Sequence, residues 1–77
     1  MGKLPVTTPK KIIKILKLIG YEFDHQRGSH IILRKTEYPH RRITVPEHKE
    51  IAKGTLRSII RESGLSLNEF LDLYKQV

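Results

Sequence analysis

Residues 21–46 read YEFDHQRGSHIILRKTEYPHRRITVP and contain three short extended patterns separated by turn signals. Apolar and polar side chains alternate over residues 21–26, and residues 29–34 include a continuous apolar run that suits a central strand. Arg27-Gly28 is a tight-turn signal between these two strands. A longer turn leads to residues 41–45, the third predicted strand, and Pro46 ends the sheet. The short connections favour an antiparallel meander.

Helix signals lie on both sides of this segment. Thr8 and the proline that follows it provide a hydroxyl cap and a favoured first helical residue, and Gly20 ends that helix. After a polar connector, Thr55 can cap a second helix that Gly64 closes, and Ser66 begins a capping-box pattern for a short last helix. The predicted order is α-β-β-β-α-α. This is an α+β fold with a three-stranded antiparallel sheet covered by helices on one face.

The spacing of apolar residues predicts which side chains form the core. On the helices, apolar residues recur every three or four positions and define one buried face, and the aromatic residues of the first strand and last helix join them. The predicted core comprises Ile12, Ile13, Leu16, Ile19, Tyr21, Phe23, Leu56, Ile59, Ile60, Phe70, Leu71 and Tyr74.

Length and charge restrict the possible functions. The 77 residues are enough for one domain, predicted over residues 8–77 after a flexible leader at residues 1–7. The chain has no cysteine, which excludes disulfides, thiolate catalysis and cysteine-ligated metals. The net charge of +7 comes from residues 1–53, with 12 basic and 5 acidic side chains, whereas residues 54–77 carry three of each. Such an uneven positive charge attracts polyanions, although it can also serve solubility alone.

Nucleic acid is a better candidate for this polyanion than a membrane. No apolar run approaches the roughly 18–20 residues needed to cross a bilayer. No amphipathic stretch places large aromatic residues beside its lysines, as a membrane-surface helix would. The glycines are dispersed and form no phosphate-binding loop, so no small-molecule cofactor is expected. We expect a cytoplasmic protein that binds RNA and no membrane.

His30 is the strongest candidate for chemistry. On the second predicted strand, Ile31 and Leu33 point to one side, while His30, Ile32 and Arg34 point to the other. The first side is the more apolar and is expected to face the helices. His30 is therefore predicted to lie on the open face of the sheet, beside the Arg27-Gly28 turn.

The register between the first two strands stays open at this point. A two-residue turn pairs His25 with His30, whereas a longer turn places His30 near Gln26. If Arg34 lies across from Glu22, an ion pair between them would make the arginine less available to a ligand.

An exposed histidine among arginines suits RNA cleavage. The imidazole has a reference pKa of about 6.5, so it can take or give a proton near neutral pH. In RNA cleavage the 2′-hydroxyl loses a proton as it attacks the neighbouring phosphorus, and the leaving 5′-oxygen gains one. Arg34, Lys35 or Arg41 can stabilise the charge that develops on the phosphate. A lone histidine on a strand is, however, often only a surface residue.

The other histidines are weaker candidates. His25 is in phase with Tyr21 and Phe23, which predicts a partly buried or sheet-edge position. His40 lies in a turn, and His48 can brace the connector before the second helix. No pair of histidines has the i, i+4 helical spacing of zinc ligands, so we expect no metal site.

The basic residues define two candidate RNA-contact surfaces. One is a helical stripe, which is also what the solvated side of an ordinary amphipathic helix looks like. The other surrounds His30 on the strands and turns. The stripe is Lys10, Lys14 and Lys17, and the second surface comprises Arg27, Gly28, Ser29, Arg34, Lys35, Arg41 and Arg42. A non-catalytic module that grips double-stranded RNA through the stripe and the arginines at the edge of the sheet is the alternative to a nuclease.

The sequence also resembles the HicA family of toxin–antitoxin modules. The resemblance is carried by Leu18-Ile19-Gly20-Tyr21, by Arg27-Gly28-Ser29-His30, by Ile43-Thr44-Val45-Pro46 with His48, and by KGTLRSIIRESGL at residues 53–65. It covers nearly all of residues 8–74. The Gly-Ser-His turn followed at this distance by Gly-Thr-Leu-Arg is the specific part of the match.

The resemblance implies a fold similar to the double-stranded-RNA-binding domain and a toxin that cleaves mRNA without the ribosome. It also implies inhibition by a HicB-type antitoxin protein that covers the active surface. The family's catalytic histidine falls on His30 and its motif glycine on Gly28. No second proton-transfer residue is identified by the resemblance.

Overall fold

The computed structural model describes residues 4–77, which form three helices and three strands in the order α-β-β-β-α-α. The predicted fold class is confirmed. In chain order the elements are α1 (Pro9–Leu18), β1 (Tyr21–Arg27), β2 (His30–Lys35), β3 (Arg42–Pro46), α2 (Lys53–Ser63) and α3 (Leu67–Gln76). Residues 1–3 of the predicted leader lie outside the described part. Leu4 packs against the core, and the Thr7 carbonyl accepts a hydrogen bond from the Ile51 N–H at 2.9 Å.

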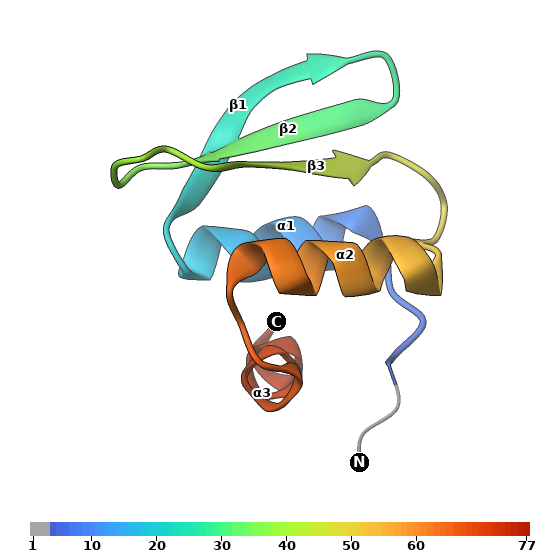
Figure 1. Cartoon of the computed structure of the whole chain (residues 1–77). Helices are drawn as coiled ribbons and strands as arrows, with labels where there is room; N and C mark the ends of the chain where they lie inside the picture. Colours follow the sequence, from blue (N-terminus) through green and yellow to red (C-terminus); the bar gives the residue numbers. More distant parts are fainter. Residues whose placement is uncertain (1–3) are drawn as a thin grey trace.

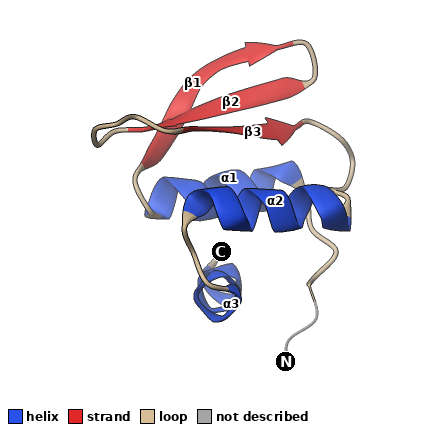
Figure 2. Cartoon of the chain, in the orientation of Figure 1, coloured by secondary structure: helices blue, strands red, loops and turns tan. Residues whose placement is uncertain are grey.

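The molecule has a sheet layer and two helical layers. The strands pair antiparallel in the order β1-β2-β3. Helices α1 and α2 lie together beneath the sheet, and α3 packs on the far side of this pair (Figure 1). Within residues 4–77, no helix covers the other face of the sheet (Figure 2). This open face is the surface on which the site described below is built.

The core fills the space between the sheet and the helices. Ile31 and Leu33 of β2 and Ile43 and Val45 of β3 are buried on the helix side, as the alternation along a strand requires. The remaining buried hydrophobic residues of this cluster are Ile12, Ile15, Leu16, Tyr21, Ile51, Leu56, Ile59, Ile60 and Phe70. The predicted core residues Ile13, Ile19, Leu71 and Tyr74 are partly buried and pack against this cluster.

One predicted core residue is wrongly placed. Phe23 is 57% exposed, although its register partner Leu33 is fully buried on the helix side. Strand β1 is at the edge of the sheet and curves away from the helical layer (Figure 1). This curvature accounts for the exposure of Phe23. The alternation predicted its face correctly but could not predict the curvature of the strand.

The start of α2 also differs from the prediction. The N-cap is Ala52, which makes no side-chain capping bond, and Thr55 lies inside the first turn. Ile51 is buried and its N–H is bonded to Thr7, so the chain is anchored immediately before the helix. This tertiary anchor replaces the side-chain cap that the sequence suggested. The predicted Thr8 cap and the left-handed Gly64 helix end are both present.

The capping box that begins α3 gives a stability prediction. Ser66 Oγ accepts from the Glu69 N–H at 3.1 Å, and Glu69 Oε1 accepts from the Ser66 N–H at 2.8 Å. Replacing Ser66 with alanine is expected to lower the free energy of unfolding by about 0.5–2 kcal/mol in urea denaturation near pH 7. Asn68→Ala in the same helix is the control and should not lower it. Equal stability of Ser66→Ala and wild type would contradict the capping role.

The pH dependence of this contribution follows from Glu69. The hydrogen bond from the Ser66 backbone N–H, and secondarily its side chain, lowers the pKa of Glu69. A pKa depressed by folding gives stability that is present above the unfolded-state pKa and is lost as the pH falls through the folded-state pKa. The difference in stability between wild type and Glu69→Ala should therefore shrink in acid, whereas Ser66→Ala keeps the backbone N–H that makes the largest contribution.

Candidate functional site

His30 is the first residue of β2 and lies on the open face of the sheet. Residues 28 and 29 form the turn that precedes it, and Gly28 adopts a left-handed φ of 57°. His30 pairs with Arg27 on β1 and with Pro46 on β3. The ring is exposed because the helix-facing positions of β2 belong to Ile31 and Leu33. The predicted exposure of His30 is confirmed, but neither register considered from the sequence is correct, because the turn begins at Gly28.

A β-bulge in β1 changes which residues share this face with His30. The register shifts between Phe23, which pairs with Leu33, and His25, which pairs with Ile32. One residue, Asp24, is therefore extra on β1, and a bulge of this kind breaks the alternation of side chains along a strand. His25 lies opposite Ile32 on the open face and is exposed. Of the two positions predicted for it, the sheet-edge one is confirmed, because β1 is an edge strand, and the partly buried one is wrong.

These residues line a shallow cavity of ≈ 300 Å³ on the open face. The only apolar side chain among them is Ile32, which is 8% exposed although no helix covers it. Neighbouring side chains bury Ile32, which forms the floor of the cavity. The cavity is lined by His25, Arg27, His30, Ile32, Arg42 and Thr44, which come from all three strands. Two imidazoles and two guanidinium groups thus surround one small concave surface.

The turn before His30 is held by a hydrogen-bond brace. Gln26 Nε2 donates to the Gly28 carbonyl at 3.0 Å and to Glu47 Oε1 at 2.8 Å. The Glu47 N–H in turn donates to the Ser29 carbonyl. The brace ties the β1–β2 turn to the chain just after β3. Its consequence is that the backbone leading into His30 is fixed from both sides, which limits the positions that the ring can adopt.

Asp24 connects β1 with β3 across the cavity. Its Oδ2 lies 2.8 Å from His25 Nδ1 and 3.5 Å from Arg42 Nε. The hydrogen bond from His25 lowers the pKa of Asp24, and the charges of His25 and Arg42 act in the same direction. Asp24 is therefore an anion near neutral pH. It holds the His25 ring in place and offsets part of the positive charge of Arg42.

The arrangement is suited to binding a phosphodiester and moving protons at it. Arg27, opposite His30, and Arg42, on the far side of Ile32, provide cationic groups on two sides of an exposed imidazole. Guanidinium groups bind phosphate oxygens with paired N–H donors. An imidazole within hydrogen-bond reach of a bound hydroxyl can act as a general base or acid.

The predicted RNA-contact residues do not form one surface. Five of them lie with His30 on the open face or at the turn beside it, namely Arg27, Gly28, Ser29, Arg34 and Arg42. Arg34 pairs with Glu22 in the register, as considered from the sequence, but no ion pair joins them in the part of the chain described.

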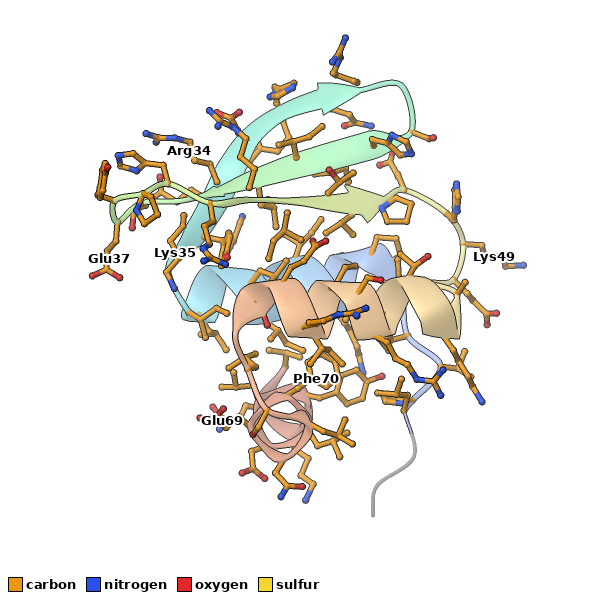
Figure 3. The ribbon with its side chains drawn as sticks, in the orientation of Figure 1. Arg34, Lys35, Glu37, Lys49, Glu69 and Phe70 are labelled. Atoms are coloured by element: carbon orange, nitrogen blue, oxygen red, sulfur yellow. The ribbon has the colours of Figure 1, made fainter. Side chains whose placement is uncertain are left out.

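Lys35 and Arg41 belong to the opposite end of the sheet. Both line a separate cavity of ≈ 440 Å³ near the β2–β3 turn, and Lys35 Nζ lies 5.3 Å from the centre of the Tyr21 ring on the helix side. Figure 3 shows Arg34 above the sheet and Lys35 below it. Arg34 and Lys35 are consecutive in sequence, but only Arg34 is on the face of the sheet that contains the His30 cavity.

The lysine stripe lies in a different layer. Lys10, Lys14 and Lys17 are all exposed on α1, beneath the sheet. A ligand on the open face does not reach them unless it passes around the edge of the molecule. They are therefore a second basic surface and not an extension of the His30 cavity.

Several residues of the site were missed by sequence reasoning. Asp24, Gln26, Thr44 and Glu47 were not singled out, and His25 was placed on the wrong face. Thr44 alone had a readable signal, because it alternates with the apolar Ile43 and Val45 on a predicted strand. The bulge that brings Asp24 and His25 together leaves no mark in the local sequence.

Two further findings concern residues 4–77. No three histidine, aspartate or glutamate side chains converge there as metal ligands. None of the helices in that part is long and apolar enough to cross a bilayer.

Comparison with protein families gives a match over most of the chain. The family model described as the HicA toxin of bacterial toxin–antitoxin matches residues 9–65. No curated protein matches the chain. The matched segment runs from α1 past the end of α2 and contains every residue that lines the His30 cavity.

Proposed function

Since the chain belongs to the HicA toxin family of bacterial toxin–antitoxin systems, we propose that it is an endoribonuclease that cleaves mRNA without the ribosome. His30 is its catalytic residue and acts as a general acid or base. The observation that carries the proposal is the exposed imidazole of His30 in a cavity with Arg27 and Arg42. Because the proposed substrate is mRNA, the proposed location of the protein is the cytoplasm.

The cavity supports a reaction in which the nucleophile is part of the RNA. The 2′-hydroxyl next to the scissile phosphate is the nucleophile, and an imidazole transfers its proton. The two guanidinium groups offset the charge that develops on the phosphate oxygens. These groups supply proton transfer and charge stabilisation from the protein, so we propose that cleavage is independent of metal ions and of any small-molecule cofactor.

A HicB-type antitoxin is the proposed protein partner. The cavity is shallow and lies on an uncovered sheet face, so a partner that docks on this face would block RNA directly. The excess positive charge of residues 1–53 favours an acidic surface on that partner.

A second candidate function rests on the lysine stripe of α1. Lys10, Lys14 and Lys17 are all exposed and form a basic surface away from the cavity. In this reading the protein is a non-catalytic module that binds double-stranded RNA. Neutralising the three lysines would then weaken binding and flatten its dependence on salt, whereas replacing His30 would change little.

The experiment that tests the proposal uses the purified chain and a labelled RNA in buffer containing EDTA. We expect cleavage to fragments that end in a 2′,3′-cyclic phosphate and begin with a 5′-hydroxyl. The control is the same RNA with a 2′-deoxy nucleotide at each cleavage site, which removes the nucleophile and should stay intact. RNA that remains whole in EDTA while duplex RNA binds tightly would contradict the proposal and favour the second candidate.

A further inference from the structure

The Asp24–His25 pair lies on the surface, outside the packed core. Both residues are on the edge strand β1, and the His25 side chain is 49% exposed. Neither belongs to the core cluster. Their hydrogen bond nevertheless fixes an imidazole at the wall of the cavity that contains His30.

The register places the two imidazoles as diagonal neighbours on one face. His25 pairs with Ile32, and His30 lies two residues before Ile32 on β2. Diagonal neighbours of this kind on adjacent antiparallel strands have Cα atoms about 7–8 Å apart. Each imidazole can reach an oxygen at about 2.6–3.2 Å. A phosphorus atom between the two rings could thus have one apical oxygen within reach of each imidazole.

The contact with Asp24 determines which nitrogen of His25 is available. An ionised carboxylate only accepts hydrogen bonds, so the hydrogen of the 2.8 Å contact belongs to Nδ1. In the part of the chain described, Nε2 makes no hydrogen bond to the protein. The ring is therefore held by one nitrogen and offers the other to a ligand in the cavity.

Given the proposed ribonuclease function, we propose that His25 is the second proton-transfer residue, acting as the general acid, and that Asp24 positions it. In the step, His30 accepts the proton of the 2′-hydroxyl as the 2′-oxygen bonds to phosphorus. The bond from phosphorus to the 5′-oxygen breaks, and His25 Nε2 gives its proton to that oxygen. The products are a 2′,3′-cyclic phosphate and a 5′-hydroxyl, and no other reactant is needed.

The two rings have different charged neighbours. The Asp24 carboxylate lies 2.8 Å from His25 Nδ1, so an anion is next to the ring that the proposal makes the general acid. Arg27 pairs with His30 in the register, so a cation is next to the ring that the proposal makes the general base. Arg42 is the other charged group of the cavity, and its Nε lies 3.5 Å from Asp24 Oδ2.

The test compares a normal RNA with the same RNA in which sulfur replaces the bridging 5′-oxygen at the cleavage site. A thiolate leaves without help from an acid because the pKa of a thiol is far below that of an alcohol. We expect His25→Ala to cleave normal RNA about 10²–10⁴-fold more slowly than wild type. The same variant should cleave the sulfur substrate at close to the wild-type rate. His30→Ala should be slow on both.

Two further readouts separate chemistry from structure. Asp24→Asn should slow normal RNA and spare the sulfur substrate, whereas Glu22→Gln removes one charge from the same strand without touching His25 and should change neither. Circular dichroism should confirm that the variants are folded, with His25→Gln as a second replacement.

The outcomes distinguish this inference from the proposed function. Wild-type rates for His25→Ala on normal RNA, or equal losses on both substrates, would overturn the acid role of His25 while leaving the nuclease intact. Full activity of His30→Ala would instead overturn the proposed function. Restoration of His30→Ala, and not of His25→Ala, by the sulfur substrate would reverse the two roles and contradict the inference.

Discussion

Replacing His30 with alanine is expected to lower the rate of RNA cleavage by about 10²–10⁴-fold, the range that a positioned general acid or base supplies. The imidazole is exposed and its neighbours Arg27 and Pro46 belong to paired strands, so its removal leaves no cavity in the core. The variant should therefore lose cleavage activity while its free energy of unfolding stays close to that of wild type. The measurement is single-turnover cleavage of labelled RNA, with the free energy of unfolding measured in parallel.

The same substitution should act in cells. Induced wild-type protein should arrest growth and degrade mRNA, and His30→Ala should do neither, while its binding to the antitoxin changes little. Tyr38→Ala is a suitable control, because it removes a larger exposed ring at the far end of the sheet. Growth arrest by His30→Ala equal to that by wild type would show that toxicity does not depend on this imidazole.

The largest stability effect is expected for Leu33→Ala. Leu33 is 0% exposed at the centre of β2, between β1 and the buried Ile43 of β3. Deleting such a side chain removes its transfer free energy and leaves a cavity, at a cost of about 2–5 kcal/mol. A domain of this size has a total stability of only about 4–12 kcal/mol. The variant should therefore lose a large part of its stability, measured as a lower midpoint of urea denaturation.

A matched leucine provides the control for this experiment. Leu18→Ala removes the same group from the end of α1, where the side chain is 57% exposed. Its expected effect is within about 0.5 kcal/mol. Equal losses at the two positions would mean that β2 is not the centre of the core.

The pattern of apolar and polar residues predicted the helices and strands of this fold, because the burial of apolar side chains determines that pattern directly. Ile31 and Leu33 had to face the helices, and the alternation of a strand then left His30 on the other side. The cap at Ser66 and the helix end at Gly64 were readable because each depends on a local conformation or side chain. Exposure of the proposed catalytic histidine could therefore be predicted without knowing the register.

Features set by long-range structure could not be predicted. The bulge at Asp24 moves His25 to the open face, and its cause lies in how β1 pairs and curves at the sheet edge. The start of α2 is fixed by Ile51, which is anchored to Thr7 from the other end of the chain. The brace between Gln26 and Glu47 likewise joins residues 21 positions apart. These contacts complete the site, and no local pattern indicates them.

The central claim is that RNA binds on the open face of the sheet with its phosphate at His30. The direct measurement is an NMR titration of the four histidine rings with an RNA made uncleavable by 2′-deoxy nucleotides. We predict that the signals of His30 and His25 shift as the RNA binds, while those of His40 and His48, outside the cavity, change little. Binding that leaves the His30 signal unmoved and perturbs the lysines of α1 instead would contradict the claim.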